Sequence, residues 1–382
     1  MSCDFDKTAI VGIGYTEFSK NSGRSELQLA AEASKAAIDD CGIKSSEIDG
    51  MVTFTLDTSE EMQLQHCLGI NELRWTSRTP FGGGGAGATV QLAAAAIASG
   101  AAKNVLIYRA FNERSGNRFG QPGFRPANTP DRDMHMSYGL HTPAQIYSLW
   151  YQRFMHKYDI SNEDLGMYTV LARKHAATNP QAWFYKRPIT IHDHQNSRWI
   201  CDPILRLLDC CQESDGGVAI IVSTADHAND LKQPGIRIIA ATQSQMIGGD
   251  YLFNYYRSEL AAYDEPSTMA THLWESSGLK PKDMDVAMLY ENFTPIVFMS
   301  LEAHGFCGEG ESKDFISEGN CELDGSLPLN TNGGLLGEGY IHGMNNIHEG
   351  VRQLRGTAAN QIADAEHVFV GSGRSGMILG KL

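Results

Sequence analysis

The feature that most constrains the fold of this chain is an internal repeat. Residues 36–54, AAIDDCGIKSSEIDGMVTF, can be laid over residues 272–290, HLWESSGLKPKDMDVAMLY, without a gap. The matched positions are a glycine, a lysine and two acids: Gly42 with Gly278, Lys44 with Lys280, Glu47 with Asp283, and Asp49 with Asp285. Both segments have the pattern of a helix end, a glycine stop, an acidic turn and a strand. Self-similarity over this distance predicts two related α/β halves packed against each other.

The elements that follow the repeat recur in the same order. Each half has a glycine-rich turn that opens a helix, FGGGGAGATVQLAAAAI at 81–97 and NGGLLGEGYIHGMNNIHEGVRQL at 332–354. Each half then ends on a strand, NVLIYRA at 104–110 and HVFVGSG at 367–373. We therefore predict a first half over 1–235 and a second half over 236–382.

Local patterns in the first half alternate strands and helices. We expect strands at 8–15 and 50–55, and helices at 25–42 and 87–100. Ser25 can cap the first helix, and Gly42 follows it as a stop. This alternation predicts an α/β fold with a mostly parallel sheet covered by helices.

Residues 111–200 interrupt the repeat. This region carries a Gly/Pro/Arg-rich stretch at 114–132 and an aromatic helix pattern, AQIYSLWYQRFMHKY, at 144–158. Insertions of this length in a compact unit usually have a function, and we expect this one to shape a site.

Charge and cysteine content exclude several classes of protein. The net charge of −14 is unsuited to sequence-independent nucleic-acid binding, which needs clustered cations. None of the eight cysteines forms a C-x-x-C pair, so a zinc ribbon is not indicated. The N-terminal residues lack the pattern of a signal peptide, and the most apolar run is broken by polar residues. Reduced thiols in a cytoplasm are the simplest interpretation.

The two halves, the insertion and the glycine-rich turns together resemble the thiolase superfamily. The similarity is closest to the sterol-carrier-protein-type thiolases, and WICDPILRLLDCCQESDGGVAIIV at 199–222 resembles their approach to the closing strand of the first half. The resemblance implies two βαβαβαββ halves packed as a layered α-β-α-β-α sandwich.

The chain departs from the thiolases at the positions that carry their chemistry. Gly83 stands where the family has its nucleophilic cysteine, and Val370 stands at its second cysteine. The family's Gly-His-Pro motif becomes Gly339-Tyr340-Ile341, and the polar residue after a late strand becomes Tyr290. Without a thiolate no acyl-enzyme can form, so thiolysis is excluded.

A superfamily branch that lacks the cysteines and has tyrosines at these two places is the steroid side-chain-cleaving aldolases. The resemblance implies retro-aldol cleavage of a 17-hydroxy steroid side chain carried as a CoA thioester, which yields a 17-keto steroid and a short acyl-CoA. It implies Tyr290 and Tyr340 as the catalytic residues and no cofactor, since CoA is part of the substrate. It also implies a homodimer, in a heterotetramer with a small partner that carries an OB fold and a zinc ribbon.

The reaction suits these residues because the thioester already serves as the electron sink. It needs a base at the hydroxyl, donors at the thioester oxygen and an acid for the α-carbon. A free phenol with a pKa of about 10 is in the right form to donate, whereas service as a base requires a pKa lowered by a cationic or hydrogen-bonding neighbour. We expect the tyrosine pair to share the proton transfers, with backbone N–H groups of the turns at 83–85 and 371–373 at the thioester oxygen.

Other interpretations of the same residues remain open. Tyr290 alone would ordinarily be a core residue, and Tyr340 could simply cover a pocket. His192, Asp193 and His194 could belong to a metal site, although a polar loop is the commoner case. His342 and His348 could tune Tyr340 or only pack, and arginines of the insertion could meet CoA phosphates: Arg114, Arg118, Arg125 and Arg132. The whole chain could instead be a non-catalytic lipid- or acyl-CoA-binding scaffold, or a condensing enzyme without cysteine.

Overall fold

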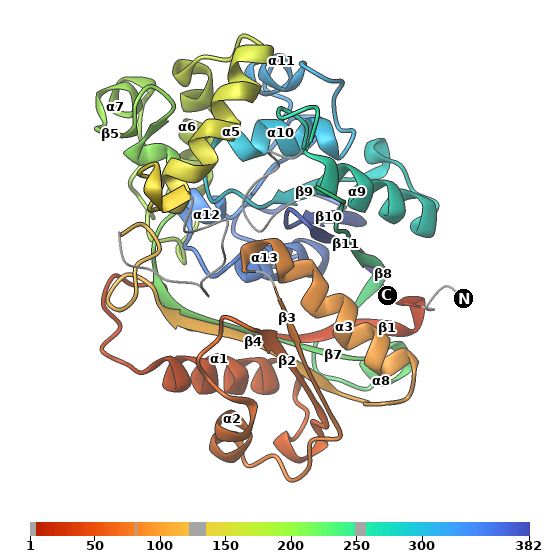
Figure 1. The fold of residues 1–382 in the computed structure, drawn as a ribbon. Coiled ribbons are helices and arrows are strands. Elements are labelled where there is room, and N and C mark those ends of the chain that lie inside the picture. The colour runs from red at the N-terminus through yellow and green to blue at the C-terminus, as the bar shows by residue number, and fades with distance from the viewer. Residues whose placement is uncertain (1–4, 81, 122–134, 249–256) are drawn as a thin grey trace.

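The computed structural model describes residues 5–80, 82–121, 135–248 and 257–382 (Figure 1). The strands of the first half are β1 (Thr8–Tyr15), β2 (Gly50–Phe54), β3 (Trp75–Thr79), β4 (Val105–Asn112) and β7 (Asp215–Thr224). Its helices are α1 (Glu26–Cys41), α2 (Glu61–Leu68), α3 (Ala86–Ala98) and α8 (Ala225–Ala228). The insertion contains α5 (Pro143–Lys157), α6 (Asn162–Thr178), α7 (Ile191–Asn196), β5 (Trp199–Cys201) and β6 (Leu205–Arg206).

The second half repeats the plan of the first. Its strands are β8 (Ile236–Gln243), β9 (Val286–Leu289), β10 (His367–Gly371) and β11 (Ser375–Lys381). Its helices are α9 (Asp264–Ser277), α10 (Pro295–Ala303), α11 (Ser312–Ser317), α12 (Gly334–Gly337) and α13 (Met344–Arg355). The described helices and strands therefore confirm the predicted strand–helix alternation, and the expected bounds differ from the observed ones by two residues at most.

The strand order is symmetric about the junction of the two halves. The order is β3-β2-β4-β7-β1-β8-β11-β10-β9, so β2-β4-β7-β1 of the first half mirrors β9-β10-β11-β8 of the second. Only two residue pairs join β1 to β8 in the middle of this order. The arrangement explains why the sequence repeat exists, since each half builds the same unit.

The prediction of a mostly parallel sheet is wrong. Only β2–β3, β2–β4 and β9–β10 are parallel, whereas β7 and β11 run antiparallel to both of their neighbours. The reason is that β11 follows β10 through a tight turn, and β7 returns from the long insertion beside β4. Alternation of strand and helix patterns does not encode the direction of these returning strands.

The repeated acids perform the same task in both halves. The carboxylate of Asp49 accepts hydrogen bonds from the backbone N–H groups of Lys103 (2.8 Å) and Asn104 (2.9 Å), just before β4. The carboxylate of Asp285 accepts from Glu366 (2.8 Å) and His367 (2.9 Å), at the start of β10. Asp49, which precedes β2, therefore fixes the start of β4, and Asp285, which precedes β9, fixes the start of β10. Gly42 and Gly278, which end α1 and α9, adopt φ of 82° and 72°, a left-handed conformation that favours glycine.

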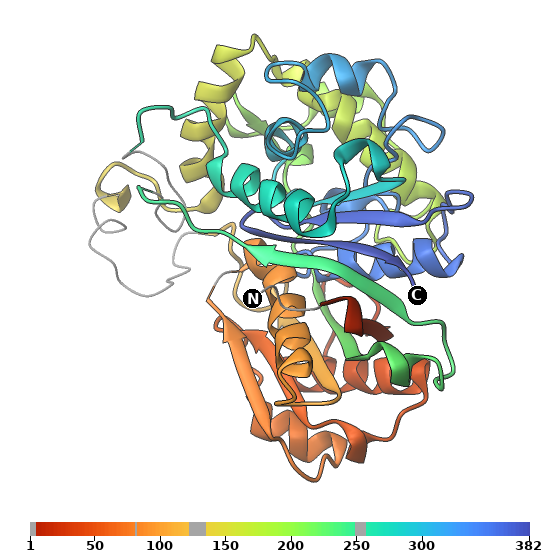
Figure 2. The same cartoon turned by 90° about the vertical axis from the view of Figure 1, so that its right-hand side faces the viewer.

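The helices and strands stack in layers (Figure 2), and three hydrophobic clusters lie between these layers. One lies between α1 and the sheet of the first half, and another lies between the sheet of the second half and the helices α9, α10, α5 and α6. The central cluster combines α3 and α13 with strands of both halves. The chain thus has the predicted layered α-β-α-β-α architecture, and α3 and α13 share its middle layer. None of the helices in the described ranges combines the length and the apolar character that a bilayer-spanning segment needs.

Candidate active site

The two tyrosines singled out by the sequence lie in direct contact. Tyr290 follows the last residue of β9, and its backbone N–H donates to the carbonyl of Gly371 (2.9 Å) in β10. Tyr340 lies in the turn between α12 and α13. The two phenol oxygens are 2.6 Å apart and share a hydrogen bond, although their positions are 50 residues apart in sequence. The side chains are 8% and 6% exposed, and both border the same cavity.

The position of the Tyr290 side chain explains why the first-half turn has a glycine, Gly83, in place of a cysteine. A Cβ atom at this position would lie only 2.1 Å from the Tyr290 hydroxyl oxygen and 2.2 Å from two of its ring carbons. Tyr290 therefore occupies the space that a side chain at position 83 would need. Val370, at the place of the second cysteine, is fully buried within β10 and does not border the cavity.

The helices of the middle layer begin beside the tyrosine pair. Gly82, Gly83 and Gly84 precede α3 and border the cavity, and Gly343 caps α13 at φ 79°. A Cβ atom on Gly343 would lie 3.1 Å from the Tyr290 ring and 3.7 Å from Ala86. The Tyr290 ring thus lies between the two helix starts, where the backbone N–H groups and the helix dipoles favour negative charge.

The turn that carries Tyr340 is preceded by two glycines, of which Gly334 is packed against Glu291 and Gly333 against Ala176. Gly333 and Gly334 have φ of 95° and 58°, and a Cβ on Gly334 would lie 1.6 Å from a Glu291 carboxylate oxygen. That oxygen accepts a hydrogen bond from the N–H of Leu335 (2.9 Å). Since Glu291 directly follows Tyr290, the contact ties the chain around one tyrosine to the turn that carries the other.

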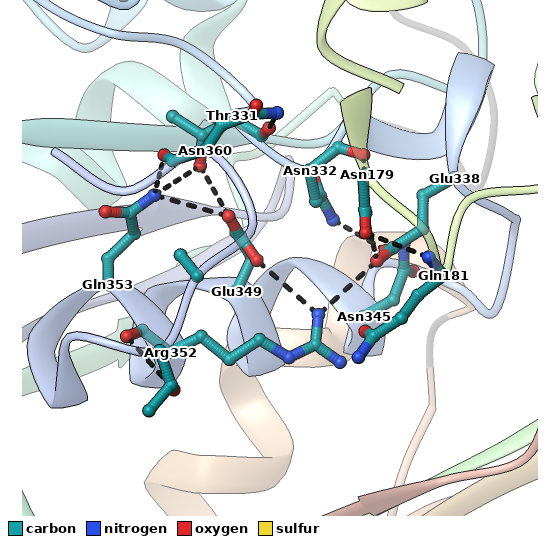
Figure 3. A network of polar contacts seen from close by, with 12 residues as sticks. Asn179, Gln181, Thr331, Asn332, Glu338, Asn345, Glu349, Arg352, Gln353 and Asn360 are labelled. Atoms are coloured by element: carbon teal, nitrogen blue, oxygen red, sulfur yellow. Dashed lines mark hydrogen bonds and ion pairs between the residues drawn. The ribbon is translucent and has the colours of Figure 1, made fainter. Parts of the chain in front are cut away.

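A buried polar network holds Glu338 and Asn345, which flank Tyr340 in the sequence (Figure 3). The Glu338 carboxylate accepts from the side-chain amides of Asn332 (2.6 Å) and Asn345 (2.9 Å), and Asn345 also donates to the Gly339 carbonyl (3.1 Å). The Arg352 guanidinium lies between the carboxylates of Glu338 and Glu349, at 3.4 and 3.5 Å. These hydrogen bonds on both sides of Tyr340 restrict the conformations that the turn can adopt.

The environment of the tyrosines keeps both phenols protonated. Burial raises the pKa of Tyr290 well above its usual value, and Tyr340 and Cys211 raise it further. Burial likewise raises the pKa of Tyr340, and Cys211 and Glu113 add to the effect. A tyrosinate base requires a lowered pKa, and the surroundings of both phenols act in the opposite direction.

His342, which follows Tyr340 by two residues, is a neutral member of the site. Its Nδ1 accepts from Nε of Arg109 (3.2 Å), and Arg109 also donates to the Asp57 carboxylate (2.8 Å). Burial and the Arg109 charge hold the pKa of His342 well below its usual value. The imidazole therefore carries its proton on Nε2. His348 instead packs against β7, where its Nε2 lies 2.9 Å from the Ala219 carbonyl.

The cavity beside the tyrosines has a volume of about 820 Å³. An apolar wall comes from the insertion and from α10 and its approach, and includes Ile146, Tyr147, Trp150, Ile200, Phe293 and Ile296. Charged residues also line the cavity, and include Lys20, Glu113, Arg114, Arg118, Arg198 and Glu213. A cavity of this size, mostly apolar with a few convergent polar groups, suits a small-molecule ligand. Residues of the insertion therefore line this cavity, and its use as a site stays a prediction.

The histidine-rich segment and the arginines of the insertion are the remaining candidates. Asp193 caps α7 through Thr190, and Nε2 of His194 lies 2.8 Å from the Asp209 carboxylate. Within the described ranges no group of three or more His, Cys, Asp or Glu could hold a metal ion. Arg114 and Arg118 border the cavity, and Arg118 pairs with Glu213. The other two arginines of the insertion, Arg125 and Arg132, lie outside the described residues.

The sequence prediction missed Glu113, a buried acid that borders the cavity beside Tyr340. The available signal was the two-residue periodicity of a strand, because Arg109, Phe111 and Glu113 then share one face. Phe111 contacts Tyr340 and His342, with ring centroids 6.3 and 5.0 Å apart.

The chain is similar in sequence to known proteins of one family. Residues 257–379 match the family described as Thiolase C-terminal domain-like. The chain is 52% identical over 381 residues to a steroid side-chain-cleaving aldolase of Thermomonospora curvata, covering 97% of each protein. It is also 52% identical to the 17-hydroxy-3-oxo-4-pregnene-20-carboxyl-CoA lyase of Mycobacterium tuberculosis, covering 98% of this chain and 99% of that enzyme.

Solved structures show the same fold. The Ltp2-ChsH2(DUF35) aldolase superposes with a TM-score of 0.93 at 51% identity, covering 98% of both chains. Human mitochondrial 3-ketoacyl-CoA thiolase superposes with a TM-score of 0.67 at 14% identity over 99% of both chains, a likeness in fold alone. The chain therefore belongs to the steroid side-chain-cleaving aldolases, a family of carbon–carbon lyases with the thiolase fold.

Proposed function

We propose that this enzyme cleaves the side chain of a 17-hydroxy steroid 20-carboxyl-CoA thioester by a retro-aldol reaction, using Tyr290 and Tyr340 for the proton transfers. The products are a 17-keto steroid and a short acyl-CoA of the propionyl-CoA type. The observation that carries the proposal is the hydrogen bond between the two phenols at the cavity wall, next to a glycine in place of a nucleophile. The named activities of the two relatives at 52% identity support the substrate class.

The linked phenols allow proton transfer without a standing tyrosinate. The substrate hydroxyl gives its proton to one phenol, which gives its own proton to the other, which protonates the α-carbon. The O–H and C17–C20 bonds break, and a C=O and a C–H bond form, so protons and electrons balance. The hydroxyl oxygen and the α-carbon are both attached to C17, and two phenol oxygens 2.6 Å apart can meet both of them. General acid–base catalysis of this kind commonly contributes 10²–10⁴-fold.

Negative charge that develops on the thioester oxygen has donors close by. The turn at Gly82–Gly84 borders the cavity at the start of α3, and His342 borders it with its protonated Nε2. Preorganised donors in a water-poor site stabilise an enolate without further rearrangement. The absence of a thiolate is then no obstacle, because the bond to be broken needs only an electron sink.

The cavity lining offers groups that suit each of the two parts of the substrate. The aromatic and aliphatic wall supplied by α5 and α10 suits the steroid rings, whose burial is favourable by about 25 cal/mol per Å² of apolar surface. Arg114, Arg118 and Arg198 border the same cavity and suit the CoA phosphates.

We further propose a homodimer that binds a small OB-fold, zinc-ribbon partner as a heterotetramer. The solved relative is an aldolase assembled with ChsH2(DUF35). Within the described residues, β3 pairs only with β2, so its other edge is available to a second copy. Light scattering of the co-purified complex is expected to give the mass of two chains and two partners, and the mass of one chain with one partner would contradict this assembly.

The experiment for the activity is product analysis with the 17-hydroxy-20-carboxyl-CoA steroid, with and without the co-expressed partner. We expect equimolar 17-keto steroid and short acyl-CoA from the complex. A complex that binds the thioester and releases neither product would contradict the proposed activity and favour the scaffold interpretation.

A further inference from the structure

The inward face of β4 and its continuation leads directly to the tyrosine pair. Arg109 donates to Nδ1 of His342, and the Phe111 ring contacts His342 and Tyr340. Glu113 is the next residue on this face, is 2% exposed and borders the cavity. Within the described part of the chain, its Oε2 is buried and has no hydrogen-bond partner.

The charged groups around Glu113 are already engaged elsewhere. Nζ of Lys20 donates to the Glu213 carbonyl (2.6 Å) and to Oε1 of Gln212 (3.2 Å). The Glu213 carboxylate accepts from Nε of Arg118 (2.6 Å) and from the N–H of Gly120 (3.0 Å). The titratable groups that influence Glu113 from the surrounding elements are Lys20, Arg109, Cys211, Glu213 and Tyr340.

These surroundings favour the uncharged carboxyl. Burial raises the pKa of Glu113 well above its usual value and the Glu213 charge raises it further, against a smaller opposing influence of the Ser214 N–H, Lys20 and Arg109. A neutral carboxyl carries an O–H, and a buried donor without an acceptor is costly. The cavity is where an acceptor can come from.

We propose that Glu113 contacts the bound thioester and donates a hydrogen bond from its carboxyl group to the thioester carbonyl oxygen, the oxygen that becomes negative on cleavage. The inference rests on the proposed function and adds a further catalytic residue to it. A carboxylic acid held neutral by its site is an effective donor to an enolate. The hydrogen bond strengthens as charge develops on the acceptor, so it lowers the barrier more than it improves substrate binding.

Two substitutions separate donation from titration. Glu113→Gln keeps an N–H donor of similar size, and Glu113→Leu removes the donor. In the complex with its partner, we expect Glu113→Gln to retain kcat within about 10-fold and Glu113→Leu to lower kcat by about 10²-fold, with a smaller change in KM. Equal losses in both variants would indicate a base at this position and would overturn the proposal, as would a wild-type kcat in Glu113→Leu.

The pH profile provides a readout that a structural role would not change. Since the protonated carboxyl is the active form, kcat is expected to fall as pH rises through the Glu113 pKa, and Glu113→Gln should lack this basic limb. Glu213→Gln removes the charge that raises the Glu113 pKa, so its basic limb should lie at lower pH than in the wild type. Burial lowers the pKa of Lys20 to about 8, so a limb that persists unchanged in Glu113→Gln belongs to Lys20 and contradicts the proposal.

Binding of propionyl-CoA, measured by calorimetry, separates this inference from the proposed activity. A wild-type complex that cleaves no substrate would contradict the proposed function. In that case the affinity for propionyl-CoA alone tests whether Glu113 contacts the thioester. We expect Glu113→Leu to bind propionyl-CoA more weakly than wild type and Glu113→Gln. Equal affinity in all three proteins would overturn the proposed contact even where cleavage is observed.

Discussion

Replacing either tyrosine by phenylalanine is expected to lower kcat by about 10³–10⁴-fold, because each phenol is one step of the proton transfer between the substrate hydroxyl and the α-carbon. Tyr290→Phe and Tyr340→Phe each remove one oxygen of the 2.6 Å pair and leave the rings in place. The measurement is the rate of 17-keto steroid formation by the complex at saturating substrate.

The same variants are expected to fold normally and to bind the partner. Loss of one neutral hydrogen bond costs about 1 kcal/mol, and the remaining hydroxyl still borders the cavity, where water can bond to it. Thermal melting and co-purification check this point. Tyr185→Phe is a matched control, since Tyr185 is exposed and does not border the cavity. A wild-type rate in either Tyr290→Phe or Tyr340→Phe would contradict the assignment of that residue.

Gly83→Ala is expected to lower kcat by at least about 10²-fold and to destabilise the fold by about 1–3 kcal/mol. The added methyl group would lie 2.1 Å from the Tyr290 hydroxyl oxygen, so the phenol must move out of the pair. Gly83→Cys should behave in the same way and should not create a thiolase, because the thiol and Tyr290 need the same space. The measurements are kcat and the free energy of unfolding.

A neighbouring glycine and a second substitution test the cause. A Cβ on Gly84 would lie 3.4 Å from its nearest contact, the Ser372 carbonyl, so Gly84→Ala should change stability little. Tyr290→Ala removes the side chain with which the new methyl group clashes. In the Tyr290→Ala background, Gly83→Ala should therefore change the free energy of unfolding much less than it does in the wild type. The double variant should remain inactive because it lacks the phenol. If Gly83→Ala were as stable and active as Gly84→Ala, the explanation for the missing cysteine would be wrong.

The repeat allowed much of the fold to be predicted because it has a local physical basis. Ser25 and Gly42 cap α1 as expected, and Asp49 and Asp285 each fix a neighbouring strand through two backbone N–H groups. The direction of β7 and β11 could not be predicted, because it depends on where the chain returns after the insertion and after a tight turn. Tyr290 and Tyr340 were singled out through the resemblance to a known family. Their direct contact across 50 residues of sequence could be seen only in the folded structure.

The electrostatic state of the site needed the structure. A phenol that serves as a base needs a nearby cation, whereas Arg109, Arg118 and Lys20 engage Asp57, Glu213 and Gln212 respectively. Burial holds both tyrosines protonated, so we expect a relay in which each phenol takes up one proton as it gives up another, without a tyrosinate. Glu113 was not predicted because its Oε2 can be recognised as lacking a hydrogen-bond partner only when the neighbouring residues are known.

The measurement that most directly tests retro-aldol cleavage without an acyl-enzyme is mass spectrometry of a reaction run in D₂O. With 17-hydroxy-3-oxo-4-pregnene-20-carboxyl-CoA and the complex, we expect 17-keto steroid, propionyl-CoA with one deuterium at its α-carbon, and unmodified protein, without added CoA. Cleavage that requires free CoA, or protein that carries an acyl group during turnover, would contradict the account.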